Sequence, residues 1–216
     1  SLYYNLITDI PENVFTANGN LQSLDITDNR IDTIGVNSFA GSALQTLVLD
    51  YNSLATVDGR WFDSVNSSLT FLSLHSNLLR EIPEGTFDNL RSLETLFISG
   101  NFFTELPSGV FANNVNITSL SLLGNRLSSI DPQWFASLTN LEALRLEYNQ
   151  IVALPNGTFQ NNPRLNDLGL TFNQISVIDR AAFGDLSNLQ WLYLEFNFIT
   201  AIDEAFFDAA IDLRGE

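Results

Sequence analysis

The stretch LEALRLEYNQIVALPNGTF, residues 141–159, decides the fold of this chain, because the rest of the sequence repeats it. Apolar residues stand at its first, fourth, sixth, eleventh and fourteenth places, asparagine at its ninth and phenylalanine at its nineteenth. After a truncated N-terminal copy, the first place recurs at Leu21, Leu44, Leu69, Leu93, Ile117, Leu141, Leu165 and Leu189. From Leu69 onward the copies are 24 residues apart. An internal repeat of this length predicts a solenoid.

Two columns of the repeat are unbroken. The ninth place is Asn5, Asn29, Asn52, Asn77, Asn101, Asn125, Asn149, Asn173 and Asn197. The nineteenth place is Phe15, Phe39, Phe62, Phe87, Phe111, Phe135, Phe159, Phe183 and Phe207. The leucines alternate as in a short strand with one buried face, and stacked copies would share one core. We expect the asparagines to pair backbone groups where the chain leaves each strand, and the phenylalanines to fill the opposite side of each coil.

These columns resemble the leucine-rich repeat family in its typical animal extracellular class, with the pattern LxxLxLxxNxLxxLPxxxFxxLxx. The proline of that pattern is present at Pro11, Pro83, Pro107 and Pro155. The resemblance implies an α/β solenoid, a horseshoe with a parallel β-sheet on its concave face and loops or short helical turns on its convex face. It is closest to the repeat cores of Toll-type receptors, variable lymphocyte receptors and insect immune repeat proteins, which implies a role in innate immunity or host defence.

We expect residues 1–216 to form a single repeat domain. It would hold a partial repeat at 1–20, eight full repeats at 21–212, and the start of another repeat or a tail at 213–216. The sequence has no leader segment and no initiating methionine, which favours a mature or excised segment. It also has no cysteine. Since secreted members of the family usually carry disulfide-bonded caps, either the chain is a repeat core without its caps, or a partner or a second copy covers its open ends.

The chain is strongly acidic, with 25 acidic residues against nine basic ones and a net charge of −16. This balance disfavours nucleic acid and anionic membranes as partners, and it favours either simple solubility or a cationic partner. No run of about twenty apolar residues occurs, so we expect no membrane insertion. Three glycosylation sequons begin at Asn66, Asn116 and Asn156, all outside the strand columns. Together they favour an extracellular location, either secreted or in the ectodomain of a cell-surface protein.

Recognition would lie at the second, third, fifth, seventh and eighth places, because these places can vary without harming the core. A C-terminal patch combines exposed aromatic and charged residues, the composition of a protein-binding hot spot. Its members are Arg145, Glu147, Tyr148, Thr171, Phe172, Trp191, Tyr193, Glu195 and Phe196. The same patch could instead pack against a C-terminal cap or a neighbouring molecule. A second, acidic patch comprises Asp25, Asp28, Asp50, Tyr51 and His75. Between the two patches, Ser99, Gly100, Ser121 and Gly124 form a featureless middle region that offers no candidate.

The sequence does not favour an enzyme. With one histidine and no cysteine, it offers no catalytic cysteine and no multi-histidine metal site. His75 would lie beside Asp50, which could orient it, but no serine completes a triad. Asp25, Asp28 and Asp50 lack the spacing of a calcium loop, so we expect no metal and no cofactor.

We therefore expect an extracellular module that binds a protein, or a protein-associated ligand, through its concave face. Two alternatives remain open. One is adhesion or guidance through self-association, as a homodimer formed by the concave face or an open solenoid end. The other is a structural spacer within a larger ectodomain.

Overall fold

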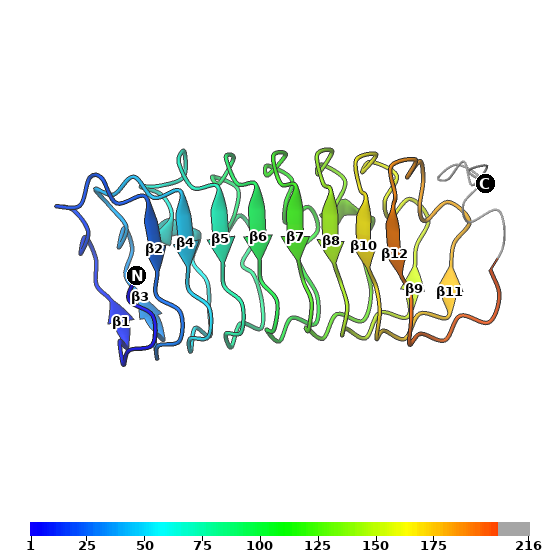
Figure 1. Cartoon of the computed structure of the whole chain (residues 1–216), viewed down its shortest axis with the longest axis horizontal. Helices are drawn as coiled ribbons and strands as arrows, with labels where there is room; N and C mark the ends of the chain where they lie inside the picture. Colours follow the sequence, from blue (N-terminus) through cyan, green and yellow to red (C-terminus); the bar gives the residue numbers. More distant parts are fainter. Residues whose placement is uncertain (203–216) are drawn as a thin grey trace.

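The chain folds into a row of stacked turns, shown side by side in the computed structural model of Figure 1. The structure describes residues 1–202. One strand from each full turn joins a parallel sheet in the order β12-β10-β8-β7-β6-β5-β4-β2. These strands are β2 (Ser23–Asp25), β4 (Thr46–Val48), β5 (Phe71–Ser73), β6 (Thr95–Phe97), β7 (Ser119–Ser121), β8 (Ala143–Arg145), β10 (Asp167–Gly169) and β12 (Trp191–Tyr193). The predicted leucine-rich repeat solenoid is confirmed.

The sheet keeps one register throughout, so each place of the repeat forms its own row. Leu47 pairs with Leu72, Leu72 with Leu96, and so on along the sheet. Residues three, four and five of each repeat form the strand. The fourth is buried in every strand up to β10, and the fifth is also buried at Ser73, Ser121 and Gly169. The third and fifth places lie on the opposite side of the strand from the fourth. We call the surface formed by the second, third, fifth, seventh and eighth places the sheet face.

The other side of the solenoid contains little regular structure. Two short parallel pairs occur there, β1 (Asp9–Ile10) with β3 (Thr33–Ile34) and β9 (Ala153–Leu154) with β11 (Val177–Ile178). Two 3₁₀ turns complete the elements, η1 (Gly59–Trp61) and η2 (Pro132–Trp134). Each follows an aspartate, Asp58 or Asp131, whose carboxylate accepts the N–H two residues later. In these two repeats an aspartate at the fifteenth place thus caps a short helical turn, whereas Pro83, Pro107 and Pro155 occupy that place in other repeats.

The core is continuous from turn to turn, because the apolar columns stack on themselves. The phenylalanine column is buried from Phe39 to Phe183. Its rings stack with centroids 5.8 Å apart between Phe135 and Phe159, and 6.2 Å apart between Phe159 and Phe183. Phe15, in the first turn, is only partly buried. The predicted Phe207 lies outside the described residues.

The asparagine column forms the predicted ladder. The Asn52 side chain donates to the carbonyl of Ile26 in the preceding turn and to the carbonyl of Leu49 in its own. Its Oδ1 accepts the N–H of Ile31 at 2.9 Å. Related bonds recur at each turn from Asn29 to Asn197, so neighbouring turns are joined by buried side-chain bonds.

Removing one asparagine from the middle of this ladder should strongly destabilise the fold. In an Asn101→Ala variant the N–H of Leu79 loses its acceptor, and the carbonyls of Leu74 and Ile98 each lose one of their two asparagine donors. A buried group without a partner costs about 1–3 kcal/mol, so we expect the free energy of unfolding in urea to fall by about 2 kcal/mol. The matched control is Asn5→Ala, since Asn5 is exposed in the first turn. Equal losses for the two variants would contradict the ladder as the source of stability.

Candidate recognition face on the sheet

The eighth place of every repeat has a left-handed backbone. Its φ angles lie between 52° and 66° at Tyr4, Asp28, Tyr51, Ser76, Gly100, Gly124, Tyr148, Phe172 and Phe196. The left-handed conformation lets the chain leave the strand so that the following asparagine can reach into the core. It crowds the β-carbon of any residue other than glycine, at a cost of about 1–2 kcal/mol. The conformational preferences of bulky residues therefore do not explain their presence at this place of the repeat.

Three of these bulky residues stack on one another. The rings of Tyr148 and Phe172 lie 4.6 Å apart with 15° between their planes, and those of Phe172 and Phe196 lie 4.2 Å apart with 5° between them. Their exposed fractions are 55%, 39% and 70%. We call Tyr148, Phe172 and Phe196 the aromatic ladder. Stacking contributes about 0.5–1.5 kcal/mol per pair, yet all three residues remain exposed.

Two further aromatic residues of the predicted patch lie on β12. Trp191 is 57% exposed and Tyr193 is partly exposed. They pair in register with Asp167 and Gly169 of β10, the strand that precedes Phe172. The structure therefore brings all five predicted aromatic residues onto three consecutive turns at the C-terminal end of the sheet face.

The charged residues of the patch already have partners within the chain. The guanidinium of Arg145 forms two hydrogen bonds with the carboxylate of Asp167, which raise the pKa of Arg145. The Thr171 hydroxyl donates to Glu195 at 2.7 Å and lowers the pKa of Glu195. Asp167 was not identified from the sequence. The sequence did contain a signal for this ion pair. Asp167 is an acidic residue at the third place of its repeat, diagonally across from Arg145 at the fifth place of the neighbouring strand.

Glu147 is the least satisfied of these charged groups. Its carboxylate lies over Gly169, where Oε1 would be 1.9 Å from a β-carbon, so any larger residue at this place would displace the carboxylate. Oε1 is 3.9 Å from Arg145 Nε, while Oε2 is buried and accepts no hydrogen bond from residues 1–202. Burial raises the pKa of Glu147, and the charge of Arg145 opposes that shift.

The acidic patch is organised around Asp50. Its Oδ1 accepts the Ser73 hydroxyl and, at 2.9 Å, the backbone N–H of His75. Asp50 thus holds the main chain of His75, and the expected orientation of the imidazole by Asp50 is wrong. The ring instead contacts the Tyr51 hydroxyl at 3.2 Å and the Ser76 hydroxyl at 3.0 Å.

The other two carboxylates of this patch do not join Asp50. Asp25 bonds to the N–H of Thr27 at 3.0 Å and to the Ser1 hydroxyl at 3.2 Å, and its bonds to Thr27 lower its pKa. Asp28 is exposed at the left-handed eighth place. Within residues 1–202, no group of three or more His, Cys, Asp or Glu side chains is placed to hold a metal ion.

The middle of the sheet face holds a hollow that the sequence did not reveal. It has a volume of about 360 Å³ and extends from Asp50 and His75, past Phe97, to Arg145. Small side chains at Ser99, Ser119, Ser121 and Ala143 leave this space. The prediction of a featureless middle region is therefore wrong, because small residues between larger neighbours form a depression.

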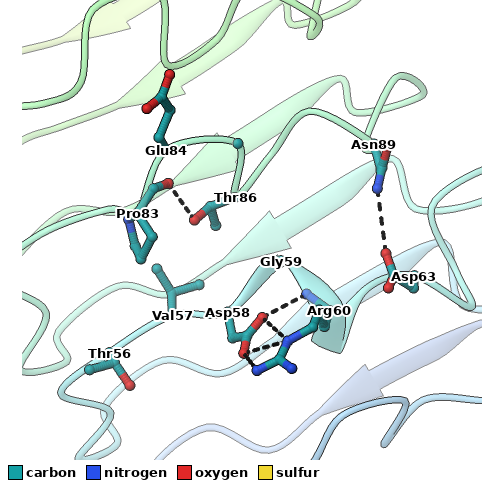
Figure 2. Close-up of a pocket in the computed structure, with 11 residues that line it drawn as sticks. Thr56, Val57, Asp58, Gly59, Arg60, Asp63, Pro83, Glu84, Thr86 and Asn89 are labelled. Carbon is teal, nitrogen blue, oxygen red and sulfur yellow. Dashed lines mark hydrogen bonds and ion pairs between the residues drawn. The ribbon is translucent and has the colours of Figure 1, made fainter.

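A larger pocket, of about 540 Å³, lies away from the sheet between two adjacent turns (Figure 2). Its one basic group, Arg60, is bound by Asp58 at 2.6 Å. Asn89 donates to Asp63 at 3.4 Å, and Thr86 donates to the Pro83 carbonyl at 2.7 Å. Most of its polar side chains therefore satisfy one another, and we regard the sheet face as the better candidate.

The three sequon asparagines all lie outside the strands. Asn116 and Asn156 are exposed and Asn66 is partly exposed. The Asn116 side chain donates to the Arg91 carbonyl at 2.9 Å, and the hydroxyl of Thr158, in the third sequon, is buried and donates to Pro155. Their glycosylation stays a prediction.

Comparison with known proteins identifies the class of this chain. A leucine-rich repeat family model matches residues 1–54, 42–103, 91–151, 139–199 and 163–210. The chain therefore belongs to the leucine-rich repeat family. No helix within residues 1–202 is long and apolar enough to cross a membrane.

Its relatives include Toll-like receptors. Human Toll-like receptor 5 is 28% identical over 116 residues, which cover 50% of this chain and 13% of the receptor. A solved TLR13–ssRNA13 complex superposes with a TM-score of 0.87 at 28% identity, over 96% of this chain and 30% of that one. The Drosophila Toll–Spatzle complex gives 0.79 at 23% identity, over 95% and 32%. The chain spans no more than 28% of the length of eight curated relatives.

Replacing Glu147 should alter the pH dependence of stability. Because burial raises its pKa, the folded state binds a proton before the unfolded chain does as the pH falls. The ionised group is therefore unfavourable above its raised pKa, and stability recovers as the pH falls toward the ordinary glutamate pKa. We expect Glu147→Gln to gain about 1 kcal/mol at neutral pH, the scale of one unpaired buried acceptor, and to lose this gain under mildly acidic conditions. Urea unfolding at several pH values measures it.

The matched control is Glu195→Gln, which makes the same chemical change at the same place of the repeat. Glu195 is exposed and its pKa is lowered, so this variant should gain no stability at neutral pH. A gain of equal size in both variants would contradict burial as the cause.

Proposed function

We propose that this chain is an extracellular recognition module in innate immunity or host defence, and that it binds a protein ligand through the sheet face. The aromatic ladder, with Trp191 and Tyr193, would supply the anchors. The main observation behind this proposal is the backbone conformation of the aromatic ladder. Three bulky aromatic residues occupy left-handed positions that disfavour them, and they remain exposed. Exposed tyrosine and tryptophan near paired charges are typical of binding hot spots.

The paired charges would contribute specificity. Arg145, Glu147 and Glu195 lie beside the aromatic anchors, and two of them are held by partners of the same chain. Side chains that are fixed before binding lose little entropy when a partner docks. We therefore expect docking largely as a rigid body, with the acidic patch of Asp25, Asp28, Asp50, Tyr51 and His75 as a secondary contact surface.

The family relationship supports recognition and leaves the ligand open. The Toll–Spatzle complex has a protein partner, whereas the TLR13 complex contains single-stranded RNA. For this chain a protein fits better than RNA, because RNA binding requires free basic groups. Arginine occurs on the sheet-face places of residues 1–202 only at Arg145, which is paired with Asp167. The three sequons support an extracellular location.

Weakening the aromatic ladder should reduce binding of the partner. We would immobilise the chain and measure which secreted proteins of the same organism it retains, using the parent, a Phe172→Ala/Phe196→Ala variant and a control. Alanine also carries a β-carbon, so the backbone cost of the eighth place is kept while the rings are lost. We expect affinity for a true ligand to fall at least about tenfold.

The control removes exposed apolar side chains elsewhere. Leu78 and Val152 are 46% and 47% exposed, and both lie outside the sheet-face places. A Leu78→Ala/Val152→Ala variant should bind as the parent does. Loss of binding in both variants to the same degree would contradict recognition through the ladder.

Self-association is the second candidate function, because the first turn of the solenoid also exposes apolar side chains. Leu2 is 42% exposed and Leu6 is 70% exposed. If the sheet face serves a foreign partner, sedimentation of the glycosylated protein should show a monomer over a wide range of concentration. A dimer that Phe196→Ala dissociates would instead favour recognition of a second copy.

A further inference from the structure

The hollow in the middle of the sheet face has a polar floor and an apolar wall. Ser99 and Ser121 are buried, and their hydroxyls bond to each other at 2.6 Å. Phe97 forms the wall and is held edge-to-face against Phe71, with centroids 5.5 Å apart and 80° between the rings. Because Phe97 and the two serines are each held by a neighbouring side chain, this part of the hollow is formed before any ligand arrives.

One carboxylate in the hollow lacks a basic partner. Asp50 Oδ1 is satisfied by Ser73 and His75, but Oδ2 accepts no hydrogen bond from residues 1–202. No ion pair reaches Asp50 within the same residues. Partial burial raises the pKa of Asp50, the direction expected for a carboxylate whose charge has no counterion.

The opposite end of the hollow does not compensate for this charge. Arg145 lines that end, but both oxygens of Asp167 already bind its guanidinium. Glu147 adds a further carboxylate at 3.9 Å from Arg145. The hollow therefore carries an unbalanced negative charge. A divalent metal ion is a poor occupant, because Asp50 is the one carboxylate that lines the hollow.

We propose that this hollow receives a lysine or arginine side chain of the protein partner. The cationic head would bind Asp50 Oδ2 and the serine hydroxyls, and the aliphatic stem would lie against Phe97 and Leu123. This inference rests on the proposed function, since it assigns one contact of the partner on the same face. The net charge of −16 would attract such a partner before contact.

The probe for this site is a lysine derivative blocked at both ends, Nα-acetyl-lysine N-methylamide. The norleucine analogue has a similar stem without the charge. In NMR titrations of the glycosylated protein, the lysine probe should shift the amide signals of Ser99 and Ser121, with a dissociation constant of roughly 1 mM. Asp50→Asn keeps an oxygen for the Ser73 and His75 donors, and it should weaken the lysine probe about tenfold.

Two further variants locate the effect. Asp25→Asn removes the same charge from the same face outside the hollow, and it should leave binding of the lysine probe unchanged. Ser119→Phe fills the hollow at the third place, where Phe71 shows that the sheet accepts phenylalanine, and it should abolish binding. Equal binding of norleucine and lysine, or equal effects of Asp25→Asn and Asp50→Asn, would overturn the proposal.

The same titration separates this inference from the proposed function. The Phe172→Ala/Phe196→Ala variant should bind the lysine probe as the parent does, because the aromatic ladder does not line the hollow. Failure of the probe to bind the parent would overturn the cation site and leave recognition by the ladder intact. Loss of probe binding in the ladder variant would also overturn the site as placed here.

Discussion

The structure depends on how the chain leaves each strand. At that point the sixth-place carbonyl and the eleventh-place N–H of each copy face the core, and buried backbone groups without partners cost about 1–3 kcal/mol each. One asparagine per turn resolves this, because its amide donates and accepts at once. Asn52 bonds to Ile26 of the preceding turn and accepts from Ile31. The same bonds that satisfy one turn thus fix its distance and register to the next.

The left-handed eighth place is a consequence of this requirement. The chain must turn sharply for the asparagine to enter the core, and every described copy does so with positive φ. Glycine at Gly100 and Gly124 accepts this backbone without crowding. Tyr148, Phe172 and Phe196 accept it with a conformational cost that stacking offsets in part. The core therefore determines the position of the aromatic rings. The rings themselves are exposed and are not part of the core.

The repeat columns predicted the fold because burial restricts the residue type at each place of the repeat separately. The strands, the asparagine ladder and the buried phenylalanine column from Phe39 to Phe183 follow from single columns. The site was predicted less fully, because it depends on pairs and gaps between neighbouring strands. The Arg145–Asp167 pair joins the fifth place of one copy to the third of the next. The hollow exists because Ser99, Ser121 and several neighbouring residues are all small. This combination spans several places of the repeat, so it cannot be read from any single column.

Charge is distributed unevenly over the sheet face, and this decides which partners it can accept. Near the aromatic ladder, Arg145 is neutralised by Asp167 and Glu195 is held by Thr171, so docking there need not supply a counterion. At Asp50 the charge is not neutralised within the described chain, so a partner that covers it must supply a cation or leave a carboxylate buried without one. The apolar anchor lies near the C-terminal end of the sheet and the unpaired carboxylate of Asp50 follows β4, near its other end. A partner that covered both would need an aromatic or aliphatic contact and a basic side chain several strands apart. The register of the sheet fixes the distance between the aromatic ladder and Asp50. This fixed distance would allow the sheet face to discriminate between ligands of similar composition.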